Sequence, residues 1–228
     1  MNQSVDIYLV STEYCDCHNE SLKRKAQDIV NESRIQKEAA LKIFYWIRDE
    51  ILFNATLNIF KKASETIEEG TVDYCNKINL HTALLRAVGI PARMQYAQIN
   101  KEILRQFVPK FLFNRIPNPI GHAWCECFLD NGWVSCEALF DESLYAGLIR
   151  ENVISSKEIP TIDWDGSDDL ILLEEWIVAR SEPISSFDDL VKYELKKVGY
   201  PPKIFCILFN WLAALGSRRK TNRFRVIV

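Results

Sequence analysis

The sequence predicts a single α+β domain in which helices come first along the chain and an antiparallel sheet follows. Helical periodicity dominates residues 20–88, and a hairpin pattern occupies residues 122–139. The chain has 228 residues, of which 48% are hydrophobic and 26% charged, so one domain with a sizeable core is expected.

The first half of the chain reads as a series of helices. Ser33 and Gln36 have the spacing of a capping box, and a helix over 34–52 is expected after them because apolar residues recur there at helical spacing: Ile35, Ala39, Ile43, Phe44, Ile47 and Ile51. Shorter helices are expected over 20–31 and over 64–69, the second closed by Gly70.

A further helix is expected from Cys75 to Val88. Capping side chains over 71–73 precede it, and Gly89 and Pro91 end it. The pattern then favours a strand over 93–99. Residues 101–121 contain three prolines and predict a long connection without regular structure: Pro109, Pro117 and Pro119.

The clearest hairpin joins strands 122–129 and 133–139 through Asp130, Asn131 and Gly132, because Asn and Gly accept positive φ. Two registers are open. A two-residue turn at 131–132 sets Asp141 opposite His122, whereas a four-residue loop over 129–132 makes Glu137 the diagonal neighbour of His122.

The last third of the chain predicts an acidic, irregular stretch over 150–183, helices over 187–198 and 203–215, and a basic tail. We therefore divide the chain into a domain over 1–183 and a helical extension over 184–228. The apolar helix at 203–215 would pack on the domain or form a homodimer contact. The alternative is peripheral association with an anionic membrane through the basic tail.

Composition limits the classes of function. A net charge of −3 argues against a nucleic-acid partner, because such proteins carry excess basic charge. No signal-peptide pattern opens the chain, and seven cysteines are an odd number, so reduced thiols in the cytoplasm are expected. The longest apolar run, 204–215, is shorter than the roughly 20 residues of a membrane-spanning helix.

Cys75 is the most informative residue. A cysteine in the first turn of a helix faces unpaired N–H groups and the positive end of the dipole, which favour the nucleophilic thiolate. Asp73 opposes this effect. Strand alternation puts His122 and Glu137 on one side of the hairpin, so an imidazole and a carboxylate are candidates to assist the thiol.

Other polar clusters predict no metal or cofactor. Cys15, Cys17 and His18 with Cys125 and Cys127 suggest zinc, but Cys-x-Cys spacing is awkward around a tetrahedral ion, and buried thiols are the simpler interpretation. His81 lies about 120° around the helix from Cys75 and is interpreted as surface or structural. The aspartates of 163–169 do not follow the spacing of a calcium loop.

Several blocks resemble the transglutaminase-like superfamily. Residues 70–75, Gly-Thr-Val-Asp-Tyr-Cys, and 84–93, Leu-Leu-Arg-Ala-Val-Gly-Ile-Pro-Ala-Arg, are similar to its cysteine-bearing helix. Residues 122–126, His-Ala-Trp-Cys-Glu, and 132–137, Gly-Trp-Val-Ser-Cys-Glu, are similar to its histidine and acid strands. The helix block 44–51 also matches, so the resemblance covers about 35–140.

The resemblance implies a papain-like core with Cys75 as the nucleophile, His122 as general base and acid, and Glu137 where the family usually has aspartate. The implied activity is cleavage or transfer at an amide of a peptide or protein through a thioester, without a cofactor. Hydrolysis is favoured over crosslinking. The alternative is a catalytically weak or inactive module that binds peptides in the same groove.

Overall fold

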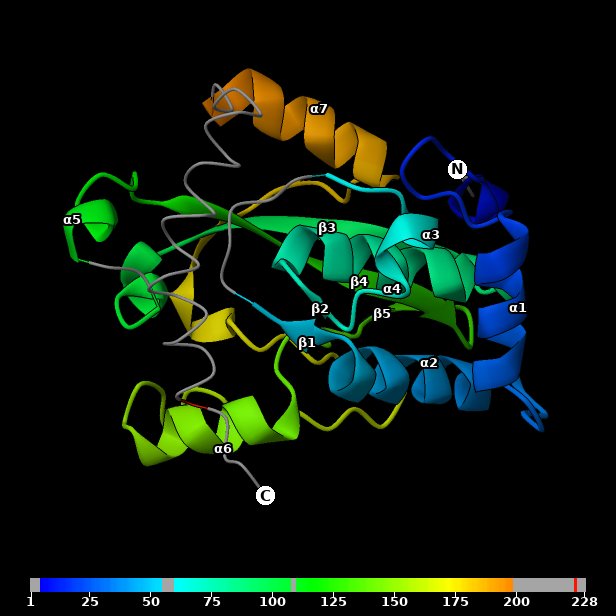
Figure 1. The fold of residues 1–228 in the computed structure, drawn as a ribbon, viewed down its shortest axis with the longest axis horizontal. Coiled ribbons are helices and arrows are strands. Elements are labelled where there is room, and N and C mark those ends of the chain that lie inside the picture. Colours follow the sequence, from blue (N-terminus) through cyan, green and yellow to red (C-terminus); the bar gives the residue numbers. More distant parts are fainter. Residues whose placement is uncertain (1–4, 55–59, 108–109, 199–223, 225–228) are drawn as a thin grey trace.

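The computed structural model describes residues 5–54, 60–107, 110–198 and 224. Its main sheet has four antiparallel strands in the order β5-β4-β3-β6 (Figure 1). The strands are β3 (Ala92–Ile99), β4 (Ile120–Leu129), β5 (Gly132–Ser135) and β6 (Ile177–Arg180). A small parallel pair joins β1 (Leu52–Phe53) to β2 (Thr71–Val72). The α+β prediction is confirmed.

Helix α4 (Tyr74–Ala87) lies across one face of the main sheet, and three helices pack around it (Figure 1). These are α1 (Glu20–Ile29), α2 (Gln36–Glu50) and α3 (Ala63–Thr66). The remaining helices are α5 (Lys110–Phe113), α6 (Glu142–Arg150) and α7 (Phe187–Val198), with 3-10 turns η1 (Val5–Leu9), η2 (Lys101–Leu104) and η3 (Glu174–Trp176).

The expected helices over 20–31, 34–52, 75–88 and 187–198 are present with slightly different ends. The prediction of a capping box at Ser33 and Gln36 is wrong. Ile35 is the N-cap residue of α2 and makes no side-chain cap, and the Ser33 hydroxyl has no partner among the described residues. The backbone N–H of Arg34 instead donates to Glu38 at 2.8 Å. Ile35, expected in the core, is exposed.

The hairpin register answers the question that the sequence left open. Phe128 pairs with Trp133 and Glu126 with Ser135, which is the register of the four-residue-loop alternative. The ladder extends one pair further, to Leu129 and Gly132, so only Asp130 and Asn131 form the turn, both with positive φ. Glu137 is therefore the residue brought towards His122.

Two expectations for the connections are wrong. Residues 101–121, expected to lack regular structure, contain η2 and α5. The region after Asp141 begins with α6, which the sequence analysis missed although the Asp141 side chain caps it by accepting the N–H of Leu144 at 2.9 Å. Strand β6 lies within residues 150–183, which the sequence predicts to be irregular. It forms a strand there because its backbone pairs with the edge of β3.

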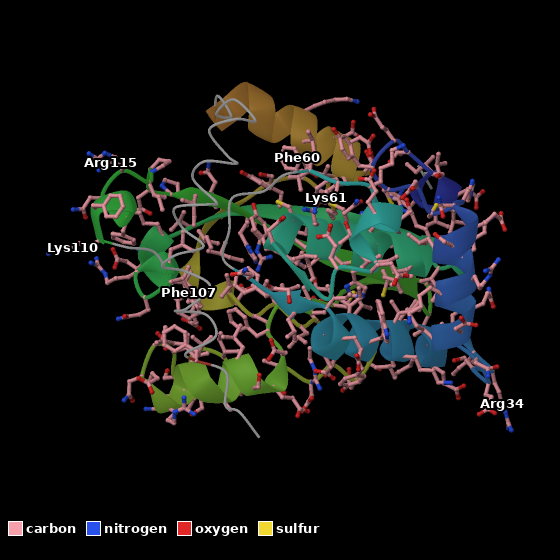
Figure 2. The ribbon with its side chains drawn as sticks, in the orientation of Figure 1. Arg34, Phe60, Lys61, Phe107, Lys110 and Arg115 are labelled. Carbon is pink, nitrogen blue, oxygen red and sulfur yellow. The ribbon has the colours of Figure 1, made fainter. Side chains whose placement is uncertain are left out.

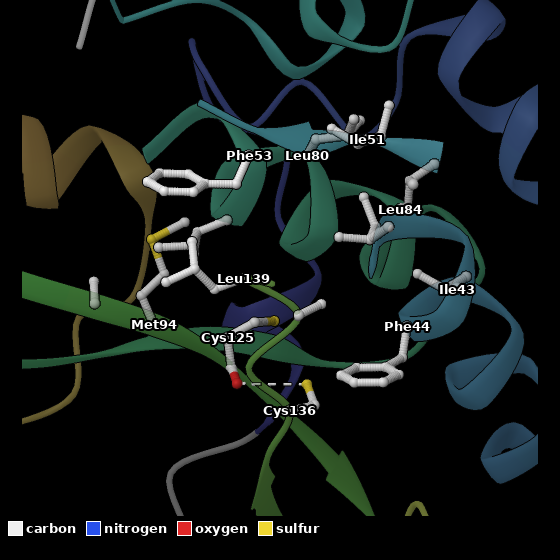
Figure 3. Packing of buried hydrophobic residues seen from close by; sticks show 14 of the residues in the cluster. Ile43, Phe44, Ile51, Phe53, Leu80, Leu84, Met94, Cys125, Cys136 and Leu139 are labelled. Atoms are coloured by element: carbon white, nitrogen blue, oxygen red, sulfur yellow. Dashed lines mark hydrogen bonds between the residues drawn. The ribbon is translucent and has the colours of Figure 1, made fainter. Parts of the chain in front are cut away.

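The core lies between α4 and the sheet and holds most of the predicted apolar face of α2, including Ile43 and Phe44 (Figure 3). Phe60, ahead of α3, contacts Phe187 of α7 with ring centroids 5.7 Å apart, while Lys110 and Arg115 lie at the periphery beside α5 (Figure 2). Helix α7 is thereby anchored to the body of the domain.

One residue of the C-terminal segment belongs to the core. Phe224 is 6% exposed, and its ring lies 5.7 Å from that of Phe107. The backbone of Phe224 comes so close to Gly147 of α6 that a Cβ there would lie 1.4 Å from the Phe224 carbonyl oxygen. Within the predicted basic tail, Phe224 is thus a buried residue. The predicted helix 203–215 lies outside the described residues, and among the described residues no helix is long and apolar enough to cross a membrane.

Arg86 ties the end of α4 to three other segments. Its buried guanidinium donates to the carbonyls of Ala92, Val10 and Ser185. Substituting lysine removes the planar fork and leaves buried carbonyls without donors. We expect Arg86→Lys to lower the free energy of unfolding by about 2–4 kcal/mol in urea titrations, whereas Arg24→Lys, on the exposed face of α1, changes it by less than about 0.5 kcal/mol. Equal losses in the two variants would contradict the role of Arg86.

Candidate active site

Cys75 occupies the first turn of α4, as the sequence predicted. Asp73 is the N-cap residue, and its carboxylate accepts the backbone N–H of Asn76 at 3.1 Å and the side-chain amide of Asn76 at 2.6 Å. The cap fixes where the helix begins, and Cys75 is 1% exposed as its second residue. The sulfur is therefore held at the positive end of the helix dipole.

The Asp73 carboxyl is buried beside this cysteine. Burial raises its pKa from 3.8 to about 6, although the hydrogen bonds from Asn76 oppose the rise. Above this pH the carboxylate lies two residues from Cys75 and disfavours the thiolate. The structure thus confirms that Asp73 belongs to the electrostatic surroundings of the thiol.

The raised pKa predicts a pH-dependent stability. The folded state binds the Asp73 proton more tightly than the unfolded state, so this contribution is full below about pH 4 and is lost as the pH rises through about 6. Asn keeps the cap without titrating. We expect Asp73→Asn to gain about 2 kcal/mol relative to the wild type between pH 4 and pH 7, in urea titrations at both values. A constant difference between the two proteins would contradict the raised pKa.

His122 and Glu137 are in direct contact. His122 Nε2 lies 2.9 Å from Glu137 Oε1, and both side chains are almost fully buried. The other carboxylate oxygen of Glu137 accepts the backbone N–H of Leu172 at 2.6 Å. This second hydrogen bond holds the carboxylate in place, and no sequence signal could have revealed it because it comes from a backbone group far along the chain.

The imidazole lies at the end of α4 where Cys75 is found. Its ring stacks on that of Tyr74 with centroids 6.0 Å apart, and it lies 5.9 Å from the ring of Trp124. Trp124 is fixed in turn by donating its indole N–H to Ser135 Oγ at 3.1 Å. Because Tyr74 directly precedes Cys75, the thiol and the His122–Glu137 pair belong to the same region.

The other carboxylates considered for His122 have different roles. Glu126 forms an ion pair with Arg93 at 2.7 Å, across β4 and β3. Asp141 caps α6 and accepts the Ser143 hydroxyl at 2.6 Å. Glu137 is therefore the acid that the geometry joins to His122.

Lys77 is a buried residue of this region that the sequence analysis missed. It is 2% exposed, and its ammonium donates to the carbonyls of Arg48 at 3.3 Å and Leu139 at 3.1 Å. It thus ties the cysteine helix to α2 and to the segment that follows Glu137. A lysine two residues after Cys75 on a helix with apolar neighbours was the available signal.

A pocket lies between α4 and β4, beside this site. It is small, about 10 Å³, and partly open to solvent, and its lining includes Tyr74, Lys77, His81, Trp124 and Glu137. A cavity of this volume holds about one water molecule, next to Glu137.

The cysteines considered for zinc in the sequence are buried thiols, as expected. Cys15, Cys17, Cys125 and Cys127 are buried, and burial raises the pKa of Cys15 to about 12. His18 is exposed. His81 is buried, so the surface interpretation of that residue is wrong. Asp163 of the acidic stretch pairs with Arg48.

Comparison with known proteins agrees with these features. Residues 23–138, just over half of the chain, match the model of the transglutaminase-like superfamily. The matched segment contains Cys75, His122 and Glu137. The chain belongs to this superfamily. Its α+β, papain-like core is the fold expected of such a protein.

Two solved structures resemble part of the chain. One, from Cytophaga hutchinsonii and named as a candidate cysteine protease, shares 21% identity over 60% of this chain, with a TM-score of 0.47. The other, from Parabacteroides distasonis and named as a candidate protease, shares 14% identity over 58%, with a TM-score of 0.39. The alignments span 43% and 25% of those proteins. No curated protein matches the chain.

Proposed function

We propose that this protein is a cysteine-dependent amide hydrolase in which Cys75 is the nucleophile, His122 the general base and acid, and Glu137 the residue that orients His122. The observation that carries the proposal is the buried His122–Glu137 hydrogen bond, beside the end of α4 that bears Cys75. A thiol, an imidazole and a carboxylate in this order form a nucleophile, its base and the group that orients the base.

The contact at Nε2 determines the tautomer of His122. When Nε2–H donates to Glu137, Nδ1 carries the lone pair and can accept the proton of the Cys75 thiol. The resulting imidazolium is stabilised by the Glu137 carboxylate, which is itself held by the Leu172 N–H. These two contacts stabilise the imidazolium and, through it, the thiolate form of Cys75 in the proposed mechanism.

The reaction has two halves. Cys75 loses its proton to His122, and the thiolate adds to the carbonyl carbon of an amide. The tetrahedral intermediate then expels the amine, which takes the proton from His122, and a thioester remains. Water attacks the thioester as His122 removes its proton, and the carboxylic acid and free thiol are released. Attack by an amine in place of water would give a new amide and make the protein an acyltransferase.

We propose a peptide bond or a protein side-chain amide as the substrate. The absence of a dedicated amine-binding pattern in the sequence favours hydrolysis over transfer. Cytoplasmic location and a dimer or membrane role for the C-terminal segment stay predictions from the sequence.

Labelling with a thiol-reactive peptide vinyl sulfone tests the proposal. We expect one label per chain, mapped to Cys75 by mass spectrometry, and a rate of labelling at least about 100-fold lower in His122→Ala, because the base that activates the thiol is lost. His18→Ala, which removes an exposed histidine, is the matched control and should label normally. Labelling of Cys75 that is indifferent to His122→Ala would instead support a peptide-binding module.

A further inference from the structure

His81, Cys125 and Cys136 form a second cluster of chemically active groups, apart from the proposed triad. They come from α4, β4 and the residue just after β5, and their ligand atoms lie within 4.8 Å of one another. All three side chains are buried, and Cys125 and Cys136 are in contact within the core (Figure 3). Three separate elements thus converge on one point.

The imidazole of this cluster has an unsatisfied acceptor. His81 Nε2 is buried and has no hydrogen-bond partner among the described residues. Leaving a buried polar atom unpaired costs about 1–3 kcal/mol, so a ligand that pairs with this nitrogen would stabilise the fold.

We infer that His81, Cys125 and Cys136 bind a single zinc ion. One imidazole and two thiolates are ligands that zinc prefers, and structural zinc takes four ligands in a tetrahedron. We assign Cys127 as the fourth ligand, because its thiol interacts with that of Cys136 and it lies on the same face of β4 as Cys125. It lies outside the group of three whose ligand atoms are within 4.8 Å of one another, so its side chain would have to move towards the ion. This set differs from the one suggested by the sequence, because Cys136 and His81 replace Cys15, Cys17 and His18.

Neighbouring groups would stabilise thiolates bound to the ion, one by a hydrogen bond and one by its positive charge. Each cysteine releases its proton to solvent as its sulfur binds the ion, and Cys136 gives up its hydrogen bond to the Cys125 carbonyl, now 3.4 Å long. The Thr82 hydroxyl already donates towards Cys125 Sγ at 3.5 Å. Three thiolates and one zinc ion carry a net charge of −1, which the nearby Lys77 offsets.

The zinc ion would be structural. Cys136 directly precedes Glu137, and His81 lies on the same helix as Cys75, so one ion would link the helix of the nucleophile to the segment of the acid. His81 and Cys125 also line the pocket described above, which provides a route to the cluster. The inference does not depend on catalysis.

Metal analysis of the full-length protein tests the inference. After refolding with zinc under reducing conditions and gel filtration, we expect about one zinc per chain in the wild type, and none in His81→Gln or Cys136→Ser. Cys17→Ala, which removes a buried cysteine outside the cluster, and Cys75→Ala should keep the ion. Because the Cys75 variant lacks the nucleophile, zinc binding is judged separately from the proposed function.

Cobalt substitution keeps the test valid if a variant fails to fold. Wild-type protein refolded with Co²⁺ should show thiolate charge-transfer bands and the intense visible bands of a tetrahedral ion, and Cys127→Ser should lose charge-transfer intensity. Wild-type protein that binds neither zinc nor cobalt would overturn the inference, as would zinc retained by both His81→Gln and Cys136→Ser. Unchanged bands in Cys127→Ser would overturn its assignment as the fourth ligand.

Discussion

Cys75→Ala is expected to abolish turnover, with kcat lowered at least about 10³-fold, because the substitution removes the thiol that forms the thioester in the proposed mechanism. An activated ester gives the measurement before a natural substrate is known. The wild type should release one equivalent of leaving group in a rapid burst as Cys75 is acylated, and the alanine variant should show no burst. The acyl group should be found on Cys75 by mass spectrometry.

Cys15→Ala is the matched control for this prediction. Cys15 is also buried, but its raised pKa keeps it a thiol, so its loss should leave the burst unchanged. A full burst in Cys75→Ala, or acylation of another cysteine in the wild type, would show that Cys75 is not the nucleophile.

Glu137→Gln is expected to lower kcat by about 10²- to 10⁴-fold while KM changes little. Glutamine has nearly the same shape and can still accept the Leu172 N–H. Its amide can also donate to His122 Nε2, which favours the tautomer with the proton on Nδ1 and removes the acceptor for the Cys75 proton. The loss therefore reports the orientation and charge of the imidazole and not a change in packing.

The pH dependence of kcat separates this effect from a loss of folded protein. The shape of the pH profile of kcat should change in Glu137→Gln together with its magnitude, because the neutral amide cannot stabilise a charged imidazolium. Glu175→Gln, an exposed change on η3 close to Leu172, should retain the wild-type rate and profile. Wild-type kcat in Glu137→Gln would exclude Glu137 as the orienting acid.

The backbone around Glu137 positions its carboxylate beside His122. β5 ends at Ser135, and the backbone N–H of Glu137 donates to the Leu170 carbonyl at 3.0 Å. The chain has therefore left the regular ladder with β4 before it reaches Glu137. The Glu137 carboxylate therefore contacts His122 from a residue outside the regular ladder.

Local signals predicted much of the fold. Gly89, with φ of +79°, ends α4 as expected, and Asp73 caps its start, because glycine tolerates that conformation and a short carboxylate reaches the first N–H groups. Signals of the same kind failed at Ser33, where Glu38 accepts the available N–H, and after Asp141, where α6 follows.

The sequence by itself determined the superfamily, the helix that presents Cys75 and the hairpin that carries His122, because spacing along a helix or strand is a local property of the chain. The expected strand over 133–139 is too long, because β5 ends at Ser135 and Glu137 lies beyond the hairpin. Only the tertiary structure decided that Glu137 and not Asp141 contacts His122, that the Leu172 N–H holds the acid, and that His81 lies among buried thiols. These contacts join residues tens of positions apart, and they depend on register and on packing against α4, which no local pattern encodes.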